Sequence, residues 1–226
     1  SQWRREDWDE ERLGYSFRVG RRLGEDLSVG FSLRDELVDV HRIENDAPQL
    51  VFDFEGENRV TSLTLTLRLN RLNDFLNPTE GYLIESNLEH AGLLGDIEFN
   101  KALVRGDYYF EAYEDASEQL HVVRLRGELG WGSEYGDTRD IPVYERFYAG
   151  GAGSLRGFRF RGVGPMDNGD PIGGKAIWIA STEYGFPLFS ENFRGVAFID
   201  TGSVALDWSD PGVFDVRVSV GVGIRV

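Results

Sequence analysis

A strict two-residue alternation of apolar and polar side chains is the feature that most constrains the fold of this chain. Every second position from Phe214 to Val226 is apolar, and the positions between them are Asp, Arg, Ser or Gly. Residues 61–72 (TSLTLTLRLNRL) follow the same rule. Successive side chains of a β-strand point to opposite faces, so this pattern predicts two-faced strands. Because no window shows the 3.6-residue period of an amphipathic helix at comparable quality, we predict an all-β fold.

The same alternation divides the chain into nine predicted strands after a short N-terminal stub. They cover residues 12–23, 26–40, 58–73, 80–92, 96–113, 119–133, 173–188, 193–206 and 214–226. The parity of the fifth strand changes near Lys101, which predicts a β-bulge there, and the facing of residues 193–206 is mixed. No Pro/Ser linker or charge tract interrupts the chain, so residues 1–226 are predicted to be one domain, with no second domain.

Two architectures give every strand an apolar face: a soluble sandwich or barrel, and a transmembrane barrel whose apolar face meets lipid. Parity alone does not separate them, but strand length and connections favour the second. Short links alternate with longer ones, which is typical of bacterial outer-membrane barrels, although the link at 92–96 is short where a long one is expected. The short links are at 23–26, 74–80, 113–119 and 189–193, and the longer ones at 41–57, 134–172 and 207–213. Trp131 and Trp178 then lie in aromatic girdles at the lipid boundary, or simply pack.

Composition excludes several classes of function. With 39 acidic against 24 basic residues the net charge is −15, so we expect no nucleic-acid partner. The chain has no cysteine, and its three histidines lie far apart in sequence, so no metal site and no cofactor is expected. The longest apolar run, residues 176–180, is too short for a membrane-spanning helix. Ser154 does not lie in a nucleophile elbow, so we expect no enzyme and no catalytic residue.

The longest connection, residues 134–172, is unusually rich in glycine and arginine. We expect Gly150, Gly151 and Gly153 to act as hinges that permit close approach to a wall. Leu155 and Phe158 are apolar where an exposed loop would be polar, so the loop is predicted to fold back into the barrel lumen. Its basic residues would then meet an acidic environment: Arg146, Arg156, Arg159 and Arg161. The alternative is a mobile surface loop with solvated arginines.

Four segments carry motifs that belong together in one family. They are FYAGGAGSLRGF (147–158), with Leu155, Arg156, Gly157 and Phe158 as its core; FIDTGSV (198–204); the turn NPTEGY (77–82), with Pro78, Thr79, Glu80 and Gly81; and IGGKAIWIASTEYGFPL (172–188). In this combination, over nearly the whole chain, they resemble the BamA/TamA superfamily of outer-membrane barrel-assembly and polypeptide-translocating proteins.

The resemblance implies a specific loop position. In that family the loop arginine enters the lumen and pairs with acidic residues of the inner wall, which here implies Arg156 with Asp200 and Glu183. Judged without the family, Asp200 would be a strand-end carboxylate that caps a turn. The turn motif Pro78–Gly81 is interpreted chiefly as hairpin geometry.

The resemblance also implies a sixteen-stranded barrel, of which this chain supplies about nine strands. It would begin within about the fifth strand and stop at Val226, where a fourteenth would end. The family's periplasmic domains and the seam between its first and last strands would then lie outside these residues.

The function implied is that of an insertase of the bacterial outer membrane, which folds and inserts β-barrel proteins, with an organellar outer membrane as the less favoured location. Its partners would be unfolded β-barrel or secreted client polypeptides, outer-membrane lipid and assembly lipoproteins. The alternatives are a polypeptide secretion barrel, a passive porin, an outer-membrane hydrolase and a soluble adhesive sandwich.

Overall fold

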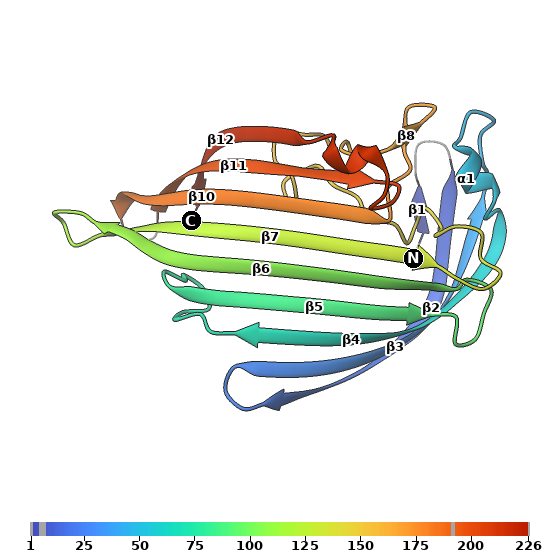
Figure 1. The fold of residues 1–226 in the computed structure, drawn as a ribbon, viewed down its shortest axis with the longest axis horizontal. Coiled ribbons are helices and arrows are strands. Elements are labelled where there is room, and N and C mark those ends of the chain that lie inside the picture. Colours follow the sequence, from blue (N-terminus) through green and yellow to red (C-terminus); the bar gives the residue numbers. More distant parts are fainter. Residues whose placement is uncertain (1, 5–7, 191–192, 226) are drawn as a thin grey trace.

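The chain forms one antiparallel meander sheet, seen in a computed structural model that describes residues 2–4, 8–190 and 193–225 (Figure 1). Ten strands pair in the order β1-β2-β3-β4-β5-β6-β7-β10-β11-β12. The strands of this sheet are β1 (Gln2–Arg4), β2 (Asp9–Leu23), β3 (Leu27–His41), β4 (Gly56–Asn70), β5 (Gly81–Ala91), β6 (Phe99–Glu114), β7 (Leu120–Glu134), β10 (Ala176–Ser190), β11 (Phe193–Ala205) and β12 (Arg217–Arg225). The predicted nine strands after a short stub are therefore confirmed. Within the described residues, β1 and β12 are the two ends of the sheet and do not pair with each other.

The outer face of the sheet exposes large apolar side chains. Val222 on β12 is 83% exposed and Leu13 on β2 is 81% exposed, and similar residues line this face on the strands between them. A soluble sandwich would bury this face against a second sheet, whereas among the described residues only the segment 211–214 packs on it, over the ends of β10 and β11 around Trp178. Exposure of this extent is typical of a surface that meets lipid. The outcome favours the transmembrane barrel over the soluble sandwich.

The inner face carries the polar residues of the alternation. Arg68 on β4 lies opposite Glu85 on β5, and Glu85 lies opposite Arg105 on β6. Arg105 donates to Glu128 on β7 at 2.9 Å, so an ion pair crosses from β6 to β7 on this wall. Such a pair compensates charges that would be costly to leave unpaired in a partly desolvated interior.

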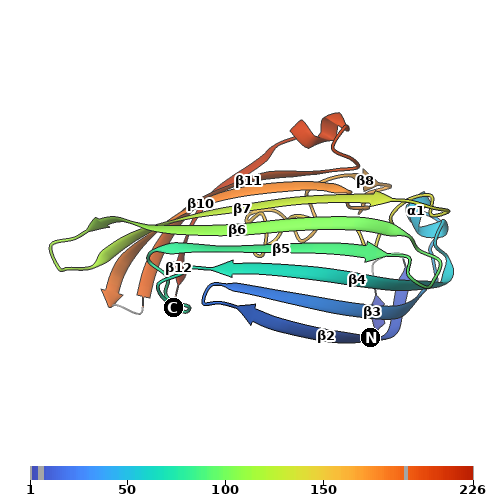
Figure 2. The same ribbon diagram turned by 60° about the horizontal axis from the view of Figure 1, so that its bottom comes forward.

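The connections β2–β3, β4–β5 and β6–β7 lie at one end of the strands (Figures 1 and 2). The longer connections β3–β4, β7–β10 and β11–β12 lie at the other end, together with the short β5–β6 link. The long-connection end holds the short helices α1 (Gln49–Phe52) and η1 (Pro211–Phe214) and a two-stranded hairpin of β8 (Met166–Asp167) and β9 (Asp170–Pro171). A buried apolar cluster joins the strand ends to α1 and to the long loop there: Trp8, Val38, Val40, Val51, Phe54, Val60, Ala91, Ile97, Phe99, Ile141, Val143 and Tyr144. None of the helices in the described residues has the length and apolarity to cross a bilayer.

Two local predictions were wrong. The pairing of β6 is regular through Lys101, and its irregularity lies between Glu111 and Tyr113 instead. The parity looked broken because Phe99 is an apolar residue on the inner face, where it packs in the buried cluster with the long loop. The last strand begins at Arg217 rather than Phe214, because Pro211 starts a 3-10 helix that Asp210 caps through a bond from the Gly212 N–H.

The turn before β5 requires glycine at its last position. Gly81 has φ +104°, and a Cβ there would overlap the Arg71 carbonyl oxygen. Gly24, in the β2–β3 turn, has a similar φ of +80° but open space around it. Comparing alanine substitutions at the two positions therefore distinguishes the cost of a positive φ from the cost of a steric clash.

We predict that Gly81→Ala lowers the free energy of unfolding by more than Gly24→Ala, whose cost is strain alone, about 1 to 3 kcal/mol. Urea unfolding in lipid vesicles measures both variants. Equal losses would show that the Arg71 contact relaxes freely.

Candidate functional site

The long loop, residues 135–175, lies on the concave side of the sheet, behind β5, β6 and β7 in Figure 2. Its first part is continuously buried over residues 141–147. Further along, its apolar side chains pack on the inner face of β10 and β11. This cluster contains Phe147, Ala149, Leu155 and Val163 from the loop and Ile177, Ile179 and Val204 from the wall, with Leu103 and Phe158 at its edge. The inner face is therefore apolar where the loop covers it.

Arg156 lies at the centre of a dense polar contact between the loop and the wall. Its guanidinium binds Asp200 of β11 in a bidentate manner, with Nε–Oδ2 2.8 Å and Nη2–Oδ1 2.7 Å. Its backbone N–H also donates to Asp200 Oδ2 at 3.1 Å. The third nitrogen, Nη1, donates to Glu183 Oε2 of β10 at 2.7 Å. Fork-to-carboxylate geometry of this kind is available to arginine and not to lysine.

Three further contacts complete this arrangement. Ser181 donates to Asp200 Oδ1 and accepts from Arg156 Nη2, and the guanidinium lies over the Phe198 ring, 3.5 Å from its centroid. Glu183 also accepts from Arg225 of β12 at 2.5 Å. We call Arg156, Ser181, Glu183 and Asp200 the Arg156 cluster. The hydrogen bond to Asp200 raises the pKa of the Arg156 guanidinium above its ordinary value, so the loop side of the cluster stays charged.

The glycines of the loop differ in what they do. Gly150 and Gly151 have φ of +111° and +93°, and a Cβ on Gly150 would overlap the Arg159 carbonyl oxygen. Gly157 has φ +85°, and its Cβ would lie 3.3 Å from Ser219 Cβ, so the loop tip approaches β12 closely. Gly153 is not in the left-handed region and has open space around it, so the structure gives no steric reason for glycine there.

Of the four loop arginines singled out in the sequence, Arg156 is the one that reaches acidic residues of the wall. Arg146 is buried but pairs within the loop, with Asp140 at 2.7 Å. Arg161 stacks on the Tyr148 ring, 4.1 Å from its centroid. Arg159 is exposed, and its guanidinium lies 4.0 Å from Met166 Sδ, within the loop.

A second charged contact, which the sequence analysis missed, holds the root of the loop. Glu145 is 5% exposed and accepts from Arg34 Nη1 of β3 at 2.8 Å. Lys101 of β6 donates to the Glu145 carbonyl oxygen at 2.9 Å and lies 3.3 Å from its carboxylate. Arg34 also donates to Glu89 of β5 at 2.9 Å. We call Glu145, Arg34, Glu89 and Lys101 the Glu145 cluster. Two features of the sequence could have indicated this contact: Glu145 is a charged residue within the otherwise buried-type run VYERFY, and Lys101 is one of only two lysines in the chain.

The charge of Glu145 depends on its neighbours. Burial alone would raise the pKa of the Glu145 carboxyl, but the attraction of Lys101 and of Arg34 outweighs it and lowers that pKa below its ordinary value of 4.5. Burial raises the pKa of the adjacent Tyr144 hydroxyl, which stays protonated. Glu145 is therefore ionised at neutral pH and binds the loop root to β3 and β6.

The turn motif lies away from the loop, at the short-turn end. Asn73 organises it: its Nδ2 donates to Thr79 Oγ1 at 2.8 Å, and its Oδ1 accepts from the N–H groups of Thr79 and Glu80. No contact in the described structure joins Pro78, Thr79, Glu80 or Gly81 to the Arg156 cluster. Of the two tryptophans, Trp178 packs under η1 and donates to the Val213 carbonyl at 3.0 Å, whereas Trp131 is 45% exposed on the outer face.

Comparison with known proteins identifies the family. The model of the Omp85 superfamily domain matches residues 3–226. The chain belongs to the Omp85 superfamily. The resemblance to the BamA/TamA superfamily, drawn from the four motifs, is thereby confirmed.

Relatives in the Omp85 superfamily include outer membrane protein assembly factors. BamA of Nitratidesulfovibrio vulgaris is 29% identical over 97% of this chain and 28% of its own length. BamA of Neisseria meningitidis is 32% identical over 70% of this chain and 20% of its own length. The human sorting and assembly machinery component 50 homolog is 29% identical over 66% of this chain and 32% of its own length. The chain therefore spans about a third or less of each.

A solved structure supports the fold. BamA from Haemophilus ducreyi, lacking POTRA domains 1–3, superimposes with a TM-score of 0.83 over 96% of this chain and 48% of that chain, at 21% identity. The antiparallel meander is thus that of an Omp85 barrel.

We predict that Arg156→Ala frees the loop tip. Removing the guanidinium leaves Asp200, which is 1% exposed, without its cation, at a cost of about 3 to 5 kcal/mol. Thermolysin cleavage at the buried Leu155 should then accelerate more than a hundredfold, since each 1.4 kcal/mol is about tenfold. Asp200→Asn should act in the same direction more weakly.

Arg159→Ala is the matched control, because it removes a neighbouring loop arginine that does not reach the wall. The account of the cluster is refuted by wild-type resistance at Leu155 in Arg156→Ala, or by equal sensitivity in Arg159→Ala.

A second prediction concerns pH. Because the folded-state pKa of Glu145 is lowered, its contribution to holding the loop root is fully present above about pH 4.5 and is lost as pH falls through the folded-state value. Hydrogen exchange of the backbone at 141–147, followed from pH 7 to pH 2 and corrected for intrinsic rates, should show this loss between about pH 4.5 and about pH 2. Glu145→Gln should open the same segment already at pH 7 and flatten its pH dependence. If Glu145→Gln kept the wild-type pH dependence of hydrogen exchange at 141–147, Glu145 would not be the group that holds the loop root.

Proposed function

We propose that this chain is part of a β-barrel that folds and inserts other β-barrel proteins in the bacterial outer membrane. The observation that carries the proposal is the Arg156 cluster, a loop arginine bound bidentately to Asp200 and singly to Glu183 on the inside of an Omp85 sheet. The apolar outer face supports a position in lipid. The names of the BamA relatives, outer membrane protein assembly factors, support the activity.

The geometry suggests how the loop would act. At its root Glu145 binds β3 and β6, and at its tip Arg156 binds β10 and β11. The loop therefore crosses the lumen as a brace between two walls. A desolvated ion pair adds little stability over apolar packing, yet breaking it is costly, so such contacts select one loop position and one wall separation. We propose that client insertion depends on that wall arrangement.

The proposed activity involves no covalent chemistry. Among the described residues no group of three or more metal-ligating side chains comes together. The clients would be unfolded β-barrel polypeptides, whose strands pair with an exposed strand edge by β-augmentation. Outer-membrane lipid would contact the outer face, and assembly lipoproteins are the further partners proposed.

The test is insertion of a model β-barrel client into liposomes that contain the protein, followed by the heat-modifiable gel shift of the folded client. We predict that Arg156→Ala lowers the insertion rate at least tenfold, that Arg156→Lys recovers only part of it, and that Arg159→Ala does not change it.

Insertion that is the same in Arg156→Ala and wild type would contradict the proposal. Ion conductance without client insertion would indicate a porin, and transfer of an unfolded polypeptide across the bilayer without insertion would indicate a secretion barrel.

A further inference from the structure

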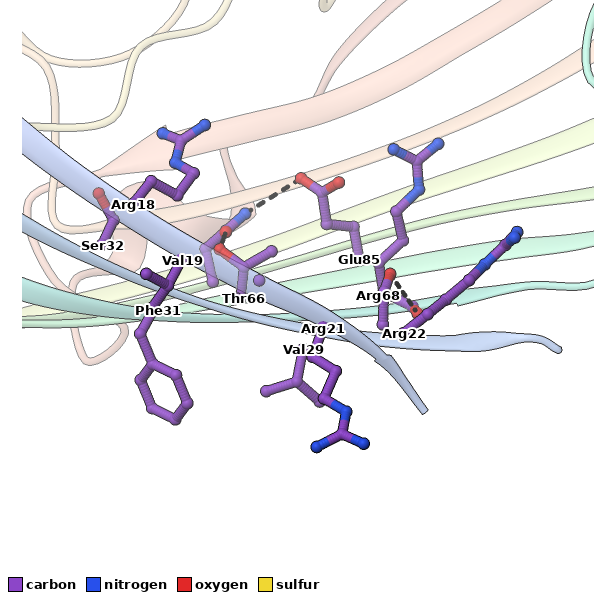
Figure 3. A pocket seen from close by; sticks show the side chains of 14 residues that line it. Arg18, Val19, Arg21, Arg22, Val29, Phe31, Ser32, Thr66, Arg68 and Glu85 are labelled. Atoms are coloured by element: carbon purple, nitrogen blue, oxygen red, sulfur yellow. Dashed lines mark hydrogen bonds between the residues drawn. The ribbon is translucent and has the colours of Figure 1, made fainter. Parts of the chain in front are cut away.

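A basic hollow lies on the inner face at the short-turn end of β2, β3 and β4, remote from the Arg156 cluster in the fold (Figure 3). Its volume is about 550 Å³. In Figure 3 Arg18, Arg22 and Arg68 project to the same side of the sheet as Glu85, whereas Arg21 and Phe31 project to the opposite, lipid-facing side.

Two glycines form the floor of the hollow. Gly20 of β2 pairs directly with Gly30 of β3, between the rows that carry Arg18 and Arg22. Neither glycine has a positive φ, and a Cβ on either would meet its neighbours only at ordinary contact distances, 3.5 Å or more. The backbone therefore does not require glycine, and what the pair achieves is an open floor below the guanidinium groups.

The arginines of the hollow differ from other cations of the inner face. Arg34, Lys101 and Arg105 each lie within ion-pair distance of a carboxylate. Among the described residues, no carboxylate lies within ion-pair distance of Arg18, Arg22 or Arg68. The one acidic residue of the lining, Glu85, stands opposite Arg68 in the strand register and accepts a hydrogen bond from Asn87. In a chain of net charge −15, this is a local excess of positive charge that faces inward.

The spacing of these cations selects the kind of ligand. Arg18 and Arg22 are four residues apart on one strand, about 13 Å at 3.3 Å per residue. Arg22 and Arg68 share a row but are separated by β3, a distance of about 10 Å. A single phosphate is too small to contact all three. An extended peptide places same-side side chains about 6.6 Å apart, so carboxylates four residues apart, about 13 Å, match Arg18 and Arg22. Arg68 lies to one side in the row of Arg22, where it flanks the second of these carboxylates.

We propose that this hollow binds an acidic peptide segment in extended conformation, with its carboxylates on Arg18, Arg22 and Arg68. Ser28, Ser32 and Thr66 line the same hollow and supply further hydrogen-bonding groups. The inference goes beyond the proposed function, because a barrel that secretes polypeptides or conducts ions could hold the same site.

The test is fluorescence anisotropy with the protein in nanodiscs of zwitterionic lipid. The probe is a labelled six-residue peptide with Glu at every second position, and the comparison peptide carries Gln at those positions. We expect Arg18→Gln/Arg22→Gln/Arg68→Gln to weaken binding of the Glu peptide at least tenfold, because the triple variant removes the charge-assisted hydrogen bonds to its carboxylates. The matched control Arg21→Gln removes an adjacent arginine from the opposite face and should leave affinity within twofold. Gly20→Leu keeps every charge but fills the floor, and it should also weaken binding.

Three results would overturn the proposal: equal affinity for the Glu and Gln peptides, an equal loss in Arg21→Gln, or inorganic phosphate binding as tightly as the Glu peptide. The heat-modifiable gel shift of each variant shows that its barrel is folded. Client insertion measured in parallel separates this proposal from the proposed function, because either one can fail alone.

Discussion

The buried carboxylate of Asp200 is the constraint on which the arrangement of the loop depends. It lies on the inner face of β11, almost without exposure, and it must be compensated there. The compensating charge comes from Arg156, 44 residues away in sequence, so the loop has to fold back onto the wall. With the guanidinium in this position, Leu155 packs in the cluster that contains Ile177 and Ile179, and the backbone at Gly157 closely approaches Ser219 of β12. Apolar packing fills the contact, while the ion pair selects its register.

The alternation gives the sheet an apolar outer face and a charged inner face, and the two faces meet different environments. On the outer face the solvent is lipid, so apolar residues such as Val222 need no protein cover. On the inner face charges are placed next to opposite charges, and Glu145 shows that this includes the loop root. The basic hollow near the short turns is the exception, because its arginines have no carboxylate of their own among the described residues. That exception is why it is a candidate site for a ligand.

Much of the fold follows from local rules, since parity at residues such as Leu63 and Val222 assigns a side chain to one face without knowledge of its neighbours. Parity failed where a second layer covers the sheet: Phe99 is apolar on the inner face because the loop packs on it, and this looked like a bulge. The partners of Arg156 were inferred from the resemblance of motifs, not from spacing. Glu145 could not be found in this way, because its partners Arg34 and Lys101 come from strands distant in sequence, and only the folded meander brings them to one point.

The position of the loop tip can be measured directly, because the chain has no cysteine and two spin labels can be placed without background. Labels at Ala152→Cys on the exposed loop and Thr182→Cys on β10 report the distance between tip and wall by pulsed electron spin resonance. We predict one narrow distance distribution in the otherwise wild-type protein and with Arg159→Ala, and a broad distribution with Arg156→Ala. A distribution that stays narrow and unshifted with Arg156→Ala would contradict the claim that this arginine holds the loop.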